Sequence, residues 1–175
     1  MAMVHGPWTI NSITMSAKKR LLDQYDLHTL LFNNVLVDIS DEESNIRMVP
    51  SINNVKWLAG HLVWGQGGLA NMGGVNMDIV WIDHYNTQLA HPPGPEIPVP
   101  SLAEIKAAWN KYAAPIREGL EKLSQEALDA PIEFPMPAFR SQEGLWTFIN
   151  HHQAYTIGQI GILRRALGKE AMKYF

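Results

Sequence analysis

The chain has 175 residues, 46% hydrophobic and 18% charged, which is typical of one globular domain, and we expect residues 1–175 to form it. Its formal net charge of −3 excludes the strong positive field that holds nucleic acid or anionic lipid, so we expect neither as a partner. The absence of cysteine excludes disulfides and thiolate chemistry. Because we identify neither a signal peptide nor an apolar run long enough to span a membrane, we expect a cytoplasmic protein.

The spacing of apolar residues predicts two helices in the first half of the chain. The first covers about residues 16–37, and the polar run that begins at Ser40 ends it and starts a loop through Pro50. The second covers about residues 53–73. The inward stripe of this second helix consists of Leu58, His61, Leu62, Gly65, Leu69 and Met72.

Two more helices are predicted in the second half, after a proline-dense segment at residues 92–100. Ser101 and Glu104 form a capping-box pattern that opens the third helix. A short turn near residues 124–128 and a proline-containing connection precede the fourth helix, which begins at Ser141 and ends before Gly168. Four helices without strand-like alternation predict an all-α four-helix bundle.

Two histidines occupy positions where a bundle normally buries leucine. His61 lies in the apolar stripe of the second predicted helix, and His152 lies in that of the fourth, so we expect them to approach each other in the core. Thr156 follows His152 by one turn on the same face, which leaves two imidazoles where a three-ligand metal site needs three donors. The alternative is that both histidines are structural and form their hydrogen bonds with each other, with Tyr155, with Gln159 or with water.

Other residues of these helices could line a cavity or allow close packing of a second helix. Trp57 and Trp64 flank His61 and would wall one side of it, or serve as ordinary core. His28 is a more distant candidate participant. The second predicted helix also carries Gly60, Gly67 and Gly74 at seven-residue spacing, which allows close approach by another helix within the fold or across a dimer.

Two segments resemble the motifs of a known family. Residues 54–62, reading NVKWLAGHL, look like the second-helix motif of the DinB-like superfamily, also called DinB/YfiT-like. Residues 152–160, reading HQAYTIGQI, look like its last-helix motif, which normally reads His, three residues, His, one residue, Gly-Gln. The resemblance spans nearly the whole chain, and the two motifs in this order are more specific than either alone.

The resemblance implies a four-helix bundle with up-down-down-up connectivity that is often a homodimer. It also implies a divalent metal, zinc or nickel, held by three histidines. His61 and His152 match two of these ligands, whereas Thr156 stands where the third histidine is expected. A threonine hydroxyl is a poor zinc ligand, so this departure weakens the metal assignment.

The sequence leaves the question of catalysis open between hypotheses. In the first, a metal held by His61 and His152 serves a hydrolase or low-molecular-weight-thiol transferase, with Thr156 orienting the nucleophile and Gln159 supporting it. In the second, the bundle has lost the catalytic metal and binds a small molecule as a binding or regulatory module. A third is metal-free acid–base catalysis by His152 with Tyr155. In each case the predicted partner is a small-molecule substrate or ligand.

Overall fold

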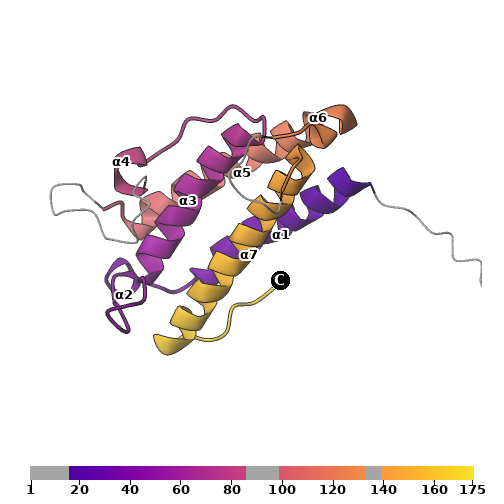
Figure 1. The fold of residues 1–175 in the computed structure, drawn as a ribbon. Helices are drawn as coiled ribbons and strands as arrows, with labels where there is room; N and C mark the ends of the chain where they lie inside the picture. The colour runs from indigo at the N-terminus through magenta and orange to yellow at the C-terminus, as the bar shows by residue number, and fades with distance from the viewer. Residues whose placement is uncertain (1–15, 86–98, 133–138) are drawn as a thin grey trace, which may run out of the picture.

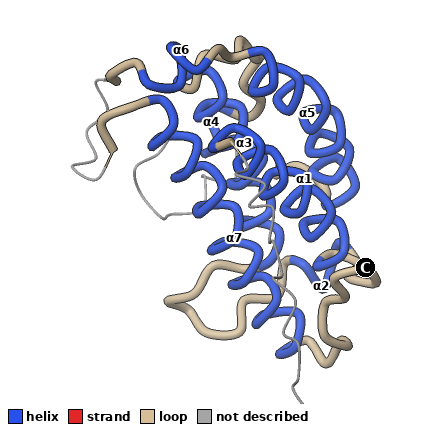
Figure 2. The backbone as a smooth tube through the Cα atoms, turned by 90° about the vertical axis from the view of Figure 1, so that its right-hand side faces the viewer, coloured by secondary structure: helices blue, strands red, loops and turns tan. Residues whose placement is uncertain are grey.

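The computed structural model describes residues 16–85, 99–132 and 139–175, and these ranges form a bundle of long helices (Figure 1). Helix and loop make up the described residues, without a strand (Figure 2), so the predicted all-α class is confirmed. None of the described helices is long and apolar enough to cross a membrane. The four long helices are α1 (Ala17–Val35), α3 (Val55–Met72), α5 (Leu102–Lys122) and α7 (Gln142–Ala166). The short helices are α2 (Asp41–Ser44), α4 (Ile82–Tyr85) and α6 (Gln125–Asp129).

Polar side chains begin the long helices where the sequence places them. The predicted capping box of α5 is present, because Ser101 accepts from the backbone of Glu104 while the Glu104 carboxylate accepts from Ser101. Ser141 caps α7, and Gly168 follows that helix with a φ of +79°, as predicted for a glycine that ends a helix. The predicted boundaries of the four long helices therefore hold to within a few residues.

Contacts along α1 set the direction of its two neighbours. Lys18, at the start of α1, donates to the carbonyl oxygen of Leu123 at 2.9 Å, just past the end of α5, so α1 and α5 are antiparallel. Asn150 of α7 donates to the Leu21 carbonyl at 3.1 Å, and Arg164, near the end of α7, donates to that of Val35. Helices α1 and α7 are therefore parallel.

Contacts along α3 complete the topology. The Trp146 indole, near the start of α7, donates to the carbonyl of Gly73 at the end of α3 at 3.1 Å, so these helices are antiparallel. Gly67 and Val75 lie against Tyr112 and Gly119 of α5, in the same order along both segments, so α3 and α5 are parallel. The predicted up-down-down-up order is confirmed, with α3 between α5 and α7.

Asp41 joins the ends of three helices at one end of the bundle. Its carboxylate pairs with the buried Lys56 ammonium of α3 at 2.6 Å and accepts the backbone N–H of Leu102, the first residue of α5, at 2.7 Å. These hydrogen bonds hold the pKa of Asp41 below its usual value. Asp41 belongs to α2, and the expectation of a loop from Ser40 through Pro50 is wrong there, because Ser40 and Glu43 form a second capping box.

Helix α3 is unusual because its glycines lie where aromatic rings pack. A Cβ at Gly60 would lie 2.5 Å from the Tyr85 ring carbon Cζ, and a Cβ at Gly67 would lie 3.0 Å from the Tyr112 ring. The close approach that the glycine spacing predicts therefore occurs within the fold, to side chains of α4 and α5. Gly74, with a φ of +86°, instead lies past the end of the helix.

This packing predicts that Gly60→Ala destabilises the protein by about 1–3 kcal/mol, because the added methyl group displaces Tyr85. The matched control is Gly158→Ala, since a Cβ on this exposed helical residue meets nothing within 4 Å, and we expect it to stabilise by about 0.5–1 kcal/mol. Urea unfolding measures both. In a Tyr85→Ala background the cost of Gly60→Ala should disappear, and a cost that persists there would contradict this explanation.

Candidate functional site

A groove of about 510 Å³ lies between α3 and α7 and brings both predicted histidines to its wall. We call it the α3–α7 groove. Helix α3 forms most of it, α7 supplies one side, and Ile79 from the segment after α3 supplies the other. Its lining consists of His61, Trp64, Gly65, Gly68, Leu69, Asn71, Met72, Ile79, Phe148 and His152.

The two imidazoles meet edge to face. The ring centroids of His61 and His152 are 5.5 Å apart, with an angle of 76° between the ring planes. His152 also lies against Gly65, where a Cβ would be in ordinary van der Waals contact with its Cε1 atom at 3.5 Å. The sequence-based expectation that these two histidines approach each other thus agrees with their geometry.

Aromatic rings enclose both histidines. Trp57 stacks on His61 with ring centroids 4.9 Å apart and planes 8° from parallel, and Trp64 lies 5.5 Å away on its other side. Phe148 stacks against His152 at 5.9 Å. Of the two tryptophans expected to wall a cavity, Trp64 lines the groove, whereas Trp57 stacks on His61 without lining it.

Burial keeps the two imidazoles neutral. Desolvation lowers the pKa of His61, and desolvation together with the neighbouring His61 lowers the pKa of His152 to about 4. Nδ1 of His61 is buried and has no hydrogen-bond partner among the described residues. Both rings are therefore available at neutral pH as nitrogen acceptors or N–H donors, but not as cations.

The remaining lining is apolar. In the described part of the chain, neither Lys, Arg, Asp nor Glu is among the residues that line the groove. Asn71 is the one amide there, and its side chain is already bonded to the backbone N–H and carbonyl of Met77, at 2.6 and 2.7 Å. These bonds hold the segment that carries Ile79, and Tyr112 adds another by accepting from the backbone N–H of Val80.

The donor set does not complete a metal site. Catalytic zinc takes three protein ligands from His, Cys, Asp or Glu, and the groove supplies two imidazoles. Within residues 16–85, 99–132 and 139–175, no three such side chains gather closely enough to hold a metal ion. Thr156 is buried at 3% exposure, but its neutral hydroxyl is a weak substitute for a third histidine. The residues described here therefore do not fit a three-ligand metal.

The two predicted catalytic residues lie outside the groove lining. Thr156 is buried in the core and Gln159 is half-buried one turn further along α7. Tyr155, the suggested acid–base partner of His152, is 63% exposed and stacks on His151 at 6.4 Å. The ring contact of Tyr155 is therefore with His151 on the exposed face of α7, and its pairing with His152 in acid–base catalysis remains a prediction.

The other histidines are not part of the groove lining. His28 is buried on α1, and its pKa is lowered by burial, an effect that the nearby side-chain amides of Gln153 and Asn150 partly offset. It faces the side of α7 that packs on α1 and does not act as a further participant of the histidine pair. His84 is buried in α4 and contacts Tyr85, while His5 and His91 lie outside the described residues.

Sequence reasoning missed three groove residues: Gly68, Asn71 and Ile79. Ile79 lies beyond the end of α3, where helical periodicity assigns no face. Gly68 is one helical turn from Gly65 and from Met72. This spacing is the sequence feature that could have indicated a face of α3 that no other helix covers. Met72, predicted as core, is 44% exposed and lines the groove instead.

Comparison with known proteins places these observations in context. The DinB superfamily profile matches residues 24–160. A crystal structure of a conserved protein from Enterococcus faecalis superposes with a TM-score of 0.70 at 18% sequence identity, covering 89% of this chain and 100% of that one. At this identity the likeness concerns the fold alone. No curated protein matches the chain significantly.

The lowered pKa of His152 predicts that the folded protein becomes less stable as the pH is lowered. A group whose folded pKa lies below its unfolded value stabilises the protein above the unfolded pKa, near 6.5, and this contribution is lost as pH falls toward about 4. The free energy of unfolding in urea, measured with a chelator present, should be lower at pH 5 than at pH 7, and His152 should contribute about 1–2 kcal/mol of this difference. Burial also lowers the pKa of His28, His61 and His84, which contribute in the same direction.

His152→Gln is the control for this pH effect, because an amide of similar size does not titrate in this range. Its stability should change less between the two pH values than that of the unmodified protein. The carboxylates with lowered pKa, such as Asp41 and Glu104, have ordinary values of 3.8 and 4.5 and contribute at lower pH. Equal pH dependence in both proteins would contradict the assignment.

Proposed function

The chain belongs to the DinB superfamily, and from that premise we propose that it binds an uncharged small molecule in the α3–α7 groove without requiring a metal ion. The observation that carries the proposal is the lining: among the residues that the structure describes, it consists of two neutral imidazoles in an otherwise apolar wall, without a charged side chain or a third metal ligand. The groove's volume of about 510 Å³ is within the range of pockets that bind small ligands.

The chemistry of the wall selects the ligand's polarity. An ionised group in the groove would lose water without gaining an opposite charge, which costs several kcal/mol. A hydroxyl, carbonyl or amide can instead exchange a hydrogen bond with His61 or His152. Their burial among Trp64 and Phe148 favours a largely apolar ligand that presents one such group to the histidine pair.

A metal-dependent hydrolase or low-molecular-weight-thiol transferase is the second candidate. Family membership and the 5.5 Å separation of the His61 and His152 ring centroids favour it, as does the unpartnered Nδ1 of His61. Zinc or nickel held by these two residues remains a prediction, as do the catalytic roles of Thr156 and Gln159. The missing third ligand is the reason that we rank this activity second.

We also propose a homodimer that uses the outer face of α7. Tyr155 and Ile162 on this face are 63% and 72% exposed, and Gly158 between them leaves open space for an approaching helix. A cytoplasmic location remains a prediction. The ligand proposal does not depend on either, since it is argued from His61, Trp64 and His152 of a single chain.

Gly68→Leu should abolish ligand binding. A Cβ at Gly68 meets nothing nearer than Ile79 at 4.0 Å, so the fold tolerates the substitution while the leucine side chain fills the groove. Thermal-shift measurements with uncharged metabolite-sized compounds, made with EDTA present, should give stabilisation in the unmodified protein and none in Gly68→Leu. The matched control, Ala107→Leu, adds a leucine side chain to an exposed site on α5 and should respond as the unmodified protein does.

Metal content per chain separates the two candidates. Protein purified without an affinity tag or added metal should contain well under one zinc or nickel per chain by elemental analysis. Thr156→His should raise zinc content above that of the unmodified protein, because it adds an imidazole one turn from His152. Near-stoichiometric metal in the unmodified protein that disappears in a His61→Ala, His152→Ala double variant would favour the second candidate.

A further inference from the structure

We infer that the groove binds an elongated aliphatic molecule with a single neutral polar end, of the class of long-chain alcohols and their esters. The inference rests on the proposed function and names the ligand class for the same site. It comes from the groove's length, the order of side chains along it, and the glycines on its floor.

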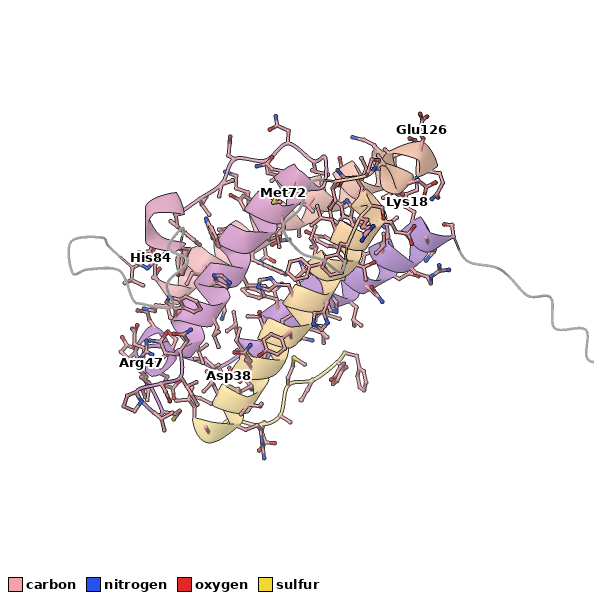
Figure 3. All side chains as sticks on the ribbon, viewed as in Figure 1. Lys18, Asp38, Arg47, Met72, His84 and Glu126 are labelled. Atoms are coloured by element: carbon pink, nitrogen blue, oxygen red, sulfur yellow. The ribbon has the colours of Figure 1, made fainter. Side chains whose placement is uncertain are left out.

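The groove is long and follows one helix. Its lining runs along α3 from His61 to Met72, and the eleven steps between these residues rise about 16 Å at 1.5 Å per residue. Met72 lies near the C-terminal end of α3 (Figure 3). A compact ligand would fill one part of this path, whereas an extended chain can contact its whole length.

The floor of the groove lacks side chains at two consecutive turns. Gly65 and Gly68 are both part of the lining, and a Cβ at Gly68 would meet only Ile79, at 4.0 Å. A ligand can therefore lie directly on the α3 backbone there. Methylene groups suit this surface because they need no hydrogen-bond partner and gain free energy from each unit removed from water.

The side chains that can hydrogen-bond to a ligand lie at one end of the groove. His61 and His152 provide the donors and acceptors at the N-terminal end of the α3 path. At the other end the walls are Leu69, Met72 and Ile79, and the Asn71 amide is already bonded to the Met77 backbone. The polar end of the ligand therefore belongs at the histidine pair, and the tail belongs toward Met72.

The lack of charge narrows the class further. With no Lys or Arg in the lining, a fatty acid's carboxylate would be desolvated without a counter-ion. A hydroxyl or ester oxygen avoids this cost and can still bond to an imidazole. We therefore assign a neutral polar end in preference to an ionised one.

The test is a chain-length series. Hexanol, octanol, decanol and dodecanol are titrated into the full chain by calorimetry with EDTA present, and decanoate and 2-naphthol are compared with them. We expect the Kd to fall about two- to fourfold for each added methylene until the groove is filled. Decanol should bind at least tenfold more tightly than decanoate or 2-naphthol.

Met72→Trp tests the direction of the chain in the groove. Met72 is 44% exposed, so a larger side chain can be accommodated while it obstructs the tail end. The gain in affinity should then stop at a shorter alcohol, with hexanol binding unchanged and dodecanol at least tenfold weaker. Leu30→Trp, on the exposed side of α1 and 44% exposed like Met72, is the matched control and should leave the whole series unchanged.

The failures of the two proposals are distinguishable. Binding of 2-naphthol with no dependence on alcohol length would overturn the aliphatic class and leave the groove's ligand-binding function standing, provided Gly68→Leu abolishes it. Tighter binding of decanoate than of decanol would overturn the neutral polar end. If none of these compounds binds the unmodified protein, this inference is overturned. If the broader thermal-shift screen also gives no stabilisation, the proposed function is overturned as well.

Discussion

The structure depends on the close packing of aromatic rings against glycines of α3. Glycines of α3 lie under aromatic rings from three other helices, and a methyl group at several of them would force the ring away. Each interior glycine costs the helix about 1 kcal/mol relative to alanine, so the packing of the rings must offset a weak intrinsic preference. The pairs are Gly60 with Tyr85, Gly65 with His152, Gly67 with Tyr112, and Gly73 with Trp146.

The same property determines the chemistry of the groove. The ring of His152 lies beside Gly65 with its centroid 5.5 Å from that of His61, and because residue 68 is glycine, the groove continues along the helix. Burial lowers the pKa of both imidazoles, so this end of the groove is polar but uncharged. A site of this kind recognises a neutral group through hydrogen bonds and the rest of the ligand through apolar contact.

The boundaries of the long helices and the meeting of His61 with His152 follow from periodicity and capping residues, whereas the up-down-down-up order was expected from the resemblance to the DinB-like superfamily. Both histidines lie in stripes that a bundle must turn inward, so their proximity is a direct consequence of the fold. Helix α2 was predictable from the spacing of Ser40 and Glu43, a local pattern that the acidic composition of the segment obscured.

Other parts of the site depend on tertiary contacts that no local pattern reports. Ile79 reaches the groove because Asn71 and Tyr112 hold its segment through hydrogen bonds to the backbone. Met72 fits the predicted inward stripe, yet at the end of α3 it faces a groove rather than a neighbouring helix. The fold of this superfamily does not by itself determine activity, and the identity of residue 156 bears on that question more than the fold does.

Native mass spectrometry of the protein, purified without added metal or ligand, tests the central claim most directly. The account predicts a population that carries a small organic molecule, with no mass increment for zinc or nickel, and predicts that Gly68→Leu loses the organic adduct. A protein that carries one divalent metal per chain, lost when His61 and His152 are replaced and unaffected by Gly68→Leu, would contradict it.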